Sequence, residues 1–270
     1  MDTTDLRTSR SLLFLPASNP RAIEKARSLP ADLVILDLED AVRAEDKAEA
    51  RRLAVEATTQ GFGEGRPVAI RVNPVGSPYF GEDVTAVRQA KLDHIVLAKT
   101  ESGKDVHDAG WLMVKPVLAM IETPRAVLDA AGIAPSAAAL IAGTNDLAAA
   151  LGLPEQKQRE GLVYALQRVV LAARAAGIPA FDGVYNKLEG DGGLEAECRQ
   201  GRAWGFDGKS VIHPSQIEIA NCLFGPTEEE LDAARRLVAA ATGGAERHEG
   251  RMIEAMHVEH AQRLLARARG

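Results

Sequence analysis

The stretch Leu33-Val-Ile-Leu-Asp-Leu-Glu39 is almost continuously apolar and ends in an acidic residue. A strand buried on both faces has this composition, because helices cover each side of a parallel sheet. Further short runs rich in Val, Ile, Leu and Ala, bounded by Pro, Gly or Asn, recur along the chain: Leu12–Pro16, Val68–Asn73, His94–Lys99, Lys115–Glu122, Ala138–Asp146, Pro179–Tyr185 and Asp207–His213. Together these runs predict eight parallel strands.

Amphipathic stretches separate the predicted strands, as at Asp46–Thr59 and Glu160–Ala176. In the second stretch apolar residues recur at three- and four-residue spacing, which gives the predicted helix one buried face. Gly177 and Pro179 then end that helix. Eight strand–helix repeats in a chain of this length favour a (β/α)8 TIM barrel over an open sheet.

The chain continues past the eighth strand for longer than a barrel needs. Two helix-like segments, Pro214–Leu223 and Glu228–Ala241, are followed by a Gly243-Gly244 break and a charged helix-like segment at Arg251–Arg269. We expect residues 1–224 to form the barrel. We expect residues 225–270 to form a C-terminal helical extension that packs on the barrel or on a neighbouring subunit.

The composition excludes some classes of function. The 270 residues include 32 Lys and Arg against 38 Asp and Glu, a net charge of −6, and 4% are aromatic. Because no basic stripe is present, we expect no nucleic-acid binding. Met1–Arg10 is polar and no stretch resembles a membrane span, so we expect a cytoplasmic protein with no membrane contact.

Three weaker signals receive a structural interpretation. Cys198 and Cys222 lie far apart in helix-like segments, and we expect both to be buried structural thiols. Gly61-Phe-Gly63-Glu-Gly65 precedes a predicted strand instead of following one, so it indicates a loop and not a dinucleotide site. His257 and His260 stand on the predicted last helix, where an exposed face is commoner than a metal site, and we assign them no metal.

Polar residues stand at the carboxyl ends of the predicted strands. They are Glu39, Asp40, Arg71, Asn73, Lys99, Glu122, Thr144, Asn145, Asp146 and His213. In a (β/α)8 barrel these ends converge on one mouth, where the reactive groups gather. The sequence therefore predicts a single polar cavity at that mouth.

One interpretation of these charges is mutual neutralisation. Arg71 would bridge Glu39 or Asp40, and Lys99 would pair with Glu122. Consecutive strand residues face opposite ways, so only one of Glu39 and Asp40 projects inward unless the strand has already ended. We expect these two acids to have a structural role or to orient Arg71.

A functional interpretation is also open. Glu122 and Asp146 come from adjacent predicted strands and offer two hard oxygen ligands to Mg²⁺. Beside such a metal, the planar fork of Arg71 is suited to grip a carboxylate or a carbonyl oxygen. His213 is either an acid–base group or a hydrogen-bonded residue at the rim.

Several segments, in this order, resemble the citrate lyase β-subunit family, within the HpcH/HpaI-type aldolases and CoA-ester lyases. The segments are Arg10-Ser-Leu-Leu-Phe-Leu-Pro16, Val34-Ile-Leu-Asp-Leu-Glu-Asp-Ala-Val42, Ile70-Arg-Val-Asn73, Val96-Leu-Ala-Lys-Thr-Glu-Ser102, Ile121-Glu-Thr123, Gly143-Thr-Asn-Asp-Leu147, Phe181-Asp-Gly-Val-Tyr185 and Gly205-Phe-Asp-Gly-Lys-Ser-Val-Ile-His-Pro214. The resemblance implies a Mg²⁺-dependent barrel, assembled as a homotrimer or hexamer, that cleaves or forms a carbon–carbon bond between an acyl-CoA and a keto acid such as oxaloacetate.

The resemblance also implies residue roles. Arg71 matches a substrate-binding arginine, Glu122 a residue that touches both substrate and metal, and Asp146 the second metal ligand. With Arg71 and Glu122, we expect Asn73, Glu39 and Asp40 to contribute to substrate binding.

The chain departs from the family pattern near the place where CoA would approach. It has Leu97-Ala-Lys99 where relatives often have Leu-Pro-Lys, and Pro16-Ala17 where a Gly often follows. We expect Arg21, Lys25 or Lys99 to bind the CoA phosphates. Relatives with a longer tail use an acid after a Met-Ile pair to handle a proton at a neighbour's site, and Glu254 takes that position here where those relatives tend to have Asp.

Four functions follow from these observations. The first is a lyase acting on citryl-CoA, citramalyl-CoA or malyl-CoA, and the second is a malyl-CoA-type thioesterase on the same barrel, which needs only a metal-held substrate and an activated water. The third is an aldolase for hydroxy keto acids without CoA, and the fourth is a scaffold without turnover, against which the presence of Arg71, Glu122 and Asp146 counts.

Overall fold

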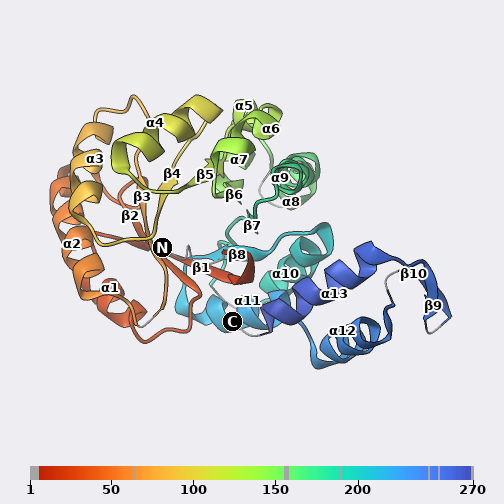
Figure 1. Ribbon diagram of the computed structural model, residues 1–270. Helices are drawn as coiled ribbons and strands as arrows, with labels where there is room; N and C mark the ends of the chain where they lie inside the picture. The colour runs from red at the N-terminus through yellow and green to blue at the C-terminus, as the bar shows by residue number, and fades with distance from the viewer. Residues whose placement is uncertain are drawn as a thin grey trace.

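The structure is a computed structural model that describes residues 6–63, 65–154, 158–188, 190–242, 244–248 and 250–268. Eight parallel strands close into a barrel in sequence order, and the helices surround it, which confirms the predicted fold (Figure 1). The strands are β1 (Ser11–Pro16), β2 (Leu33–Asp37), β3 (Val68–Val72), β4 (His94–Leu97), β5 (Val117–Ile121), β6 (Ala139–Ala142), β7 (Ala180–Asp182) and β8 (Gly208–Val211). The barrel closes where Ser11 of β1 pairs with Lys209 of β8.

Gly208 allows this closure. A Cβ at this position would lie 2.6 Å from the backbone oxygen of Ser9 and 2.7 Å from that of Arg10. Real Cβ atoms do not approach backbone atoms so closely, and backbone cannot swing aside as a flexible side chain can. A glycine at the start of β8 therefore lets the last strand come close to the first.

Helices follow the strands, and some connections between strands contain two or three short helices instead of a single one. They are α1 (Pro20–Ala26), α2 (Lys47–Gln60), α3 (Phe80–Gln89), α4 (Gly103–Met113), α5 (Pro124–Leu128), α6 (Ala130–Ile133), α7 (Thr144–Ala150), α8 (Gln158–Gly161), α9 (Val163–Ala176), α10 (Gly193–Trp204) and α11 (Pro214–Phe224), with the 3-10 turns η1 (Leu6–Thr8), η2 (Ala44–Asp46) and η3 (Ala134–Ser136). Side-chain caps define several helix starts. The hydroxyl of Ser102 accepts from the N–H of Asp105, and that of Thr123 from the N–H of Ala126.

Two apolar clusters pack on the two sides of the sheet. The smaller one fills the barrel interior and contains Leu12, Phe14, Leu33, Ile35, Ala69, Val96, Leu118, Met120, Ala139, Ile141 and Phe181 from the strands, with Leu6. The larger one lies between the strands and the helices. Burial on both faces explains why the strands are continuously apolar. The filled interior also separates the two ends of the barrel.

Several of the predicted strands extend further toward the mouth than the strands of the structure do. Strand β2 ends at Asp37, two residues before the predicted Glu39. Strand β6 ends at Ala142, so Thr144, Asn145 and Asp146 form the first turn of α7 and not a strand end. These short polar side chains favour helix starts and turns over a buried strand.

The C-terminal extension differs from its prediction in one respect. Helix α12 (Glu228–Ala240) has the expected place, but β9 (Glu246–His248) and β10 (Arg251–Ile253) pair as an antiparallel hairpin, and α13 (Ala255–Arg267) begins four residues later than predicted. Gly243, in the predicted break, lies outside the described residues. The Arg267 guanidinium donates to the carbonyls of Asp207 (2.6 Å) and Phe224 (3.1 Å), so α13 returns to its own barrel. The division into a barrel and an extension as two domains stays a prediction.

The minor sequence predictions have mixed outcomes. Cys198 is buried in α10 as expected, but the prediction for Cys222 is wrong, because it is exposed on α11. Residues 61–63 and Gly65 belong to no helix or strand, as predicted for the loop, and Glu64 lies outside the described residues. In the part of the chain that the structure describes, no helix is long and apolar enough to cross a membrane.

Candidate active site

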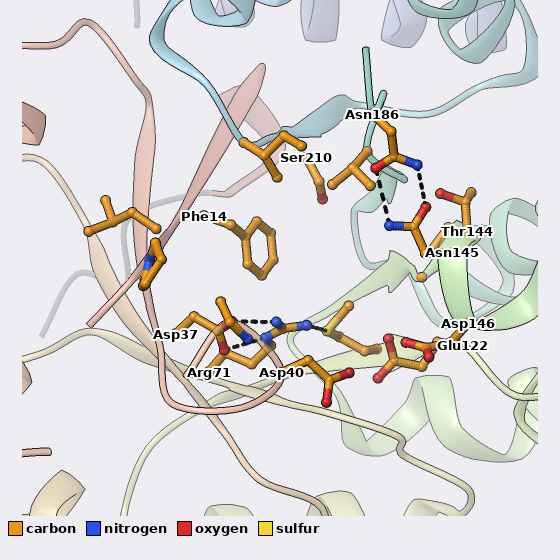
Figure 2. Close-up of a pocket in the computed structure, with 18 residues that line it drawn as sticks. Phe14, Asp37, Asp40, Arg71, Glu122, Thr144, Asn145, Asp146, Asn186 and Ser210 are labelled. Carbon is orange, nitrogen blue, oxygen red and sulfur yellow. Dashed lines mark hydrogen bonds and ion pairs between the residues drawn. The ribbon is translucent and has the colours of Figure 1, made fainter. Parts of the chain in front are cut away.

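A cavity of about 410 Å³ opens at the carboxyl ends of the strands, as predicted. Its lining comprises Phe14, Leu15, Pro16, Asp37, Asp40, Ala41, Arg71, Met120, Glu122, Ala142, Gly143, Thr144, Asn145, Asp146, Val184, Asn186, Ser210 and Ile212. Figure 2 shows the charged side chains Asp37, Arg71, Asp40, Glu122 and Asp146 along one side of the cavity, with the Phe14 ring beside Arg71. A mostly apolar cavity with a few converging polar groups is the usual form of a small-molecule site.

Arg71 is held by an acid that the sequence analysis missed. Its Nε donates to Asp37 Oδ1 at 2.6 Å and its Nη2 to Asp37 Oδ2 at 2.5 Å, a two-pronged ion pair at the ends of β2 and β3 (Figure 2). The guanidinium also lies over the Phe14 ring, 5.4 Å from its centroid. Burial opposes the charge, but the bonds to Asp37 raise the pKa of Arg71 above its usual value. The sequence did contain a signal for this pair: Asp37 is a lone acid within an apolar strand, and a buried charge requires a partner of opposite charge.

The neighbouring acids share a different cation. Since β2 has ended before them, both Glu39 and Asp40 reach Lys99, whose Nζ lies 2.5 Å from Glu39 Oε1 and 3.1 Å from Asp40 Oδ2. Arg71 approaches Glu39 at 3.5 Å, so the expected bridge between them is present. Burial raises the pKa of Glu39, against the bond from Lys99. The amine of Lys99 thus contacts two carboxylates, and its contact with a CoA phosphate stays a prediction.

Glu122 is buried deeper than any other acid in the lining except Asp37, at 1% exposure for each. Its Oε1 accepts the backbone N–H of Lys99 at 2.6 Å, where the predicted pairing was with the Lys99 amine. Burial raises the pKa of Glu122 to about 7, and the carboxylate of Asp146 adds to the shift, while the Lys99 N–H and Arg71 oppose it. A cation beside this carboxyl group would stabilise its ionised form.

Asp146 supplies the second carboxylate of this wall. It is half-buried on the first turn of α7, and Figure 2 shows its carboxylate beside that of Glu122, with Asp40 nearby. Carboxylate oxygens are the ligands that Mg²⁺ prefers, and Mg²⁺ keeps several waters when one or two carboxylates hold it. Among the described residues no three His, Cys, Asp or Glu side chains form a closed cage, so a cation here would keep positions for water or a ligand. The donor set fits Mg²⁺.

Several predicted residues lie outside the cavity lining. Asn73 is buried and bonds to Asp83 Oδ2 (2.6 Å) and the Leu38 carbonyl (3.1 Å), so it fixes the loop after β3. His213 caps α11 by accepting the N–H of Ser215, which is the rim position foreseen as one alternative. Arg21 and Lys25 are exposed on α1, just beyond the end of β1 that forms part of the rim; their CoA contact stays a prediction.

Asn186 was not foreseen. Its amide and that of Asn145 bond reciprocally, at 2.7 and 3.2 Å, and so join the loop after β7 to the first turn of α7 (Figure 2). Asn186 directly follows the predicted seventh strand, so its position was a signal of the same kind as that of Asn145. The pair steadies the turn that carries Asp146.

Comparisons with known proteins agree with this geometry. A family model described as HpcH/HpaI aldolase/citrate lyase matches residues 10–214. A (3S)-malyl-CoA thioesterase of Cereibacter sphaeroides (strain KD131 / KCTC 12085) is 42% identical over 270 residues, which cover 96% of this chain and 94% of the relative. The citrate lyase subunit beta of Escherichia coli (strain K12) is 32% identical, over 97% of this chain and 94% of the relative.

Solved structures show the same relationship. The protein CitE from Mycobacterium tuberculosis, crystallised with magnesium, acetoacetate and coenzyme A, superposes with a TM-score of 0.83 at 33% identity and covers 98% of this chain and 100% of its own. The M. tuberculosis citrate lyase beta subunit complexed with oxaloacetate and magnesium has a TM-score of 0.74 at 31% identity, over 82% of this chain and 99% of its own. The resemblance expected from the motifs is confirmed: the chain belongs to the HpcH/HpaI aldolase/citrate lyase family.

Proposed function

We propose that this protein is a Mg²⁺-dependent enzyme that acts on a malyl-CoA-type thioester, a short 3-hydroxyacyl-CoA with a second carboxylate. The observation that carries the proposal is the presence of Arg71, Glu122 and Asp146 around one cavity at the barrel mouth. A carboxylate pair and a guanidinium match the oxygens of a hydroxy acid and the cation that bridges them. The magnesium complexes of similar proteins support the choice of metal.

Each residue of the site has a distinct task in this proposal. Glu122 and Asp146 would hold Mg²⁺, which when bound polarises a substrate oxygen as a Lewis acid. Asp37 occupies the Nε and Nη2 of Arg71. The remaining nitrogen, Nη1, lies 3.7 Å from Met120 Sδ and 3.5 Å from Glu39 Oε2, and it is the group that would meet the substrate. Arg71 then binds a carboxylate or carbonyl oxygen in a fixed direction.

Hydrolysis of the thioester is the first candidate reaction. Water adds to the thioester carbonyl, the C–S bond breaks, and the products are free CoA and the hydroxy diacid. The thioesterase from C. sphaeroides is more similar to this chain than the citrate lyase subunit is, at 42% against 32% over comparable lengths. Glu254, at the position where lyases are expected to use a tail acid, is the N-cap residue of α13. Its backbone carbonyl accepts the N–H of His257 at 2.9 Å, and its own N–H donates to His257 Nδ1 at 3.0 Å.

Carbon–carbon cleavage is the second candidate, favoured by the structural similarity to CitE with acetoacetate and coenzyme A. In that reaction the 3-hydroxyl loses its proton and the C2–C3 bond breaks, with its electron pair left on the acyl-CoA half as an enolate. Protonation of the enolate at C2 gives the acyl-CoA, and the other product is the keto acid. The same cavity would serve both reactions, because each develops negative charge on a substrate oxygen, and Arg71 together with a Mg²⁺ held by the two carboxylates would stabilise that charge.

Product analysis tests the proposal. The purified protein is incubated separately with malyl-, citramalyl- and citryl-CoA, with Mg²⁺ or with a chelator, and CoA products are identified by mass spectrometry. Free CoA formed only with Mg²⁺ supports hydrolysis, and acetyl-CoA or propionyl-CoA with a keto acid supports the lyase. Activity on pyruvate and aldehydes without CoA would instead indicate the aldolase, and no product from any substrate would contradict the proposal.

The assembly and location of the protein belong to the same proposal. We expect a homo-oligomer, a trimer or hexamer, as the family resemblance implies, and a cytoplasmic location, where CoA thioesters are formed. Light scattering coupled to gel filtration measures the first. A monomer at micromolar concentration that is fully active would contradict it.

A further inference from the structure

A second cavity, of about 1000 Å³, lies at the end of the barrel opposite the mouth. Its floor is formed by η1 and by the loops that precede β7 and β8, at Gly177–Ile178 and Gly205–Asp207. Its walls are α12 and α13, which pack against each other beside α10 and α11 (Figure 1). The amino ends of the strands and the filled barrel interior separate it from the candidate active site.

Arginines dominate the charge of this cavity. Its lining contains Arg7, Arg174, Arg202, Arg263 and Arg267, together with His257 and His260. The acids among the lining residues are Asp207 and Glu230. The cavity therefore has an excess of three positive charges with both histidines neutral, although the whole chain has a net charge of −6. Such a local excess attracts anions.

The first of these acids is already shared between several donors. Asp207 Oδ2 accepts the backbone N–H of Ala180 at 2.9 Å and Arg174 Nη2 at 2.8 Å. Arg267 Nη1 lies 3.5 Å from Asp207 Oδ1, and its Nη2 donates to two backbone carbonyls. One carboxylate thus serves two guanidinium groups and a backbone amide.

The second acid, Glu230, is also shared between donors. Glu230 Oε2 accepts the backbone N–H of Thr227 at 2.8 Å, which caps α12, and Arg202 Nη2 at 2.7 Å. Arg263 is exposed on α13 and forms no ion pair with any residue that the structure describes. At least one guanidinium at this cavity therefore has no carboxylate partner among the described residues.

The arginines are close enough to affect one another. Burial lowers the pKa of Arg267, and the charges of Arg202, Arg174 and Arg10 add to the lowering, while Asp207 opposes it. Like charges gathered around a partly buried group destabilise the empty cavity, and a bound anion removes that cost.

We propose that this cavity binds a small molecule carrying phosphate groups. A guanidinium group donates two parallel hydrogen bonds to two oxygens of a phosphate group. A chloride ion or a water molecule cannot accept hydrogen bonds in this paired geometry. The volume suits a ligand larger than inorganic phosphate. Apolar side chains of Phe206, Phe224, Leu237 and Leu264 line the same walls and offer a surface for a base or an acyl group.

Titration calorimetry on the full chain tests this proposal. The protein, in buffer with a chelator so that no metal at the mouth takes part, is titrated with inorganic pyrophosphate, with ADP and with malonate. We expect saturable binding of pyrophosphate or ADP that weakens as KCl is raised, and at least tenfold weaker binding of malonate. Equal affinities for pyrophosphate and ADP would indicate that the cavity binds a free polyphosphate. Tighter binding of ADP would indicate that it binds a nucleotide whose base contacts the apolar wall.

Variants locate the binding. Arg263→Glu should weaken pyrophosphate binding at least tenfold and Arg263→Gln by less, because both change an exposed side chain without removing a described contact. Arg235→Gln is the matched control, since Arg235 pairs with Asp232 on α12 outside the cavity and should leave the affinity unchanged. Thermal unfolding of each variant without ligand verifies its fold.

Three results would overturn the proposal. One is the absence of any binding of pyrophosphate or ADP up to about 10 mM. Another is wild-type affinity in Arg263→Glu. The third is a loss of binding in Arg71→Gln that Arg263→Glu does not share, which would place the anion at the mouth.

Discussion

Gly143 provides the space in which the Glu122 side chain lies. A Cβ at position 143 would stand 2.2 Å from the Cβ of Glu122 and 2.4 Å from its Oε2. Glu122 directly follows β5 and Gly143 directly follows β6, so the close approach is made where two neighbouring strands end at the mouth. The direction of the proposed metal-binding carboxylate therefore depends on the absence of a side chain on the next strand.

Gly143→Ala should displace the Glu122 carboxylate and lower kcat/KM by at least tenfold, with a stability loss of about 1–3 kcal/mol from overpacking. Steady-state kinetics and thermal unfolding measure the two effects. Gly81→Ala is the control, because a Cβ there meets nothing within 4 Å and the change should leave activity unaltered. Equal activities of the two variants would contradict this role of Gly143.

Asp146→Ala should abolish turnover and the dependence on Mg²⁺ together, because one proposed ligand is removed while the half-buried position tolerates a smaller side chain. Calorimetric titration with Mg²⁺ measures the metal affinity independently of activity. Wild-type affinity and turnover in this variant would refute the metal assignment.

Asp37→Asn keeps the shape of the side chain but removes the charge that fixes Arg71. A loss of about 2 kcal/mol of interaction in the transition state corresponds to roughly a thirtyfold lower kcat/KM. The matched control is Asp32→Asn, which weakens a similar two-pronged pair with Arg10 away from the mouth. The control should lose stability without a change in KM, and the same kinetic defect in both variants would argue against a positioning role of Asp37.

The metal-free protein should lose stability as the pH rises from about 4.5 to about 7. Burial raises the pKa of Glu122 to about 7 in the folded state, above its ordinary value of 4.5, so the folded state binds more protons than the unfolded state in this window. The loss is on the order of 3 kcal/mol at most. Urea unfolding with a chelator at several pH values measures it.

Glu122→Gln is the comparison for that experiment. It cannot ionise, so its stability should fall less over the same pH range than that of the wild type. Saturating Mg²⁺ should also flatten the wild-type dependence, because the cation stabilises the carboxylate. An identical pH slope in the variant would show that another group is responsible.

Arg21→Gln together with Lys25→Gln should raise the KM for the CoA thioester several-fold and leave kcat unchanged, if these exposed cations of α1 bind the CoA phosphates. Arg52→Gln, on the exposed face of α2, is the control for a change of surface charge. An unchanged KM in the double variant would place the phosphates elsewhere.

The sequence by itself determined the architecture and most of the mouth. Parallel strands buried on both faces leave a run of apolar residues, and this local signal predicted the eight strands. The convergence of carboxyl ends then placed Arg71, Glu122 and Asp146 around one cavity without knowledge of any contact.

Only the tertiary structure decided which charged side chains pair with each other and which distant segments lie side by side. The partner of Arg71 is Asp37 and that of Glu39 is Lys99, separated by 34 and 60 residues, and these choices depend on where each strand ends and how the strands are staggered. The arginine-lined cavity likewise exists only because α13 returns to the amino end of the barrel. Strand periodicity is encoded locally, whereas partner choice arises from the closure of the barrel, which brings distant residues to fixed distances.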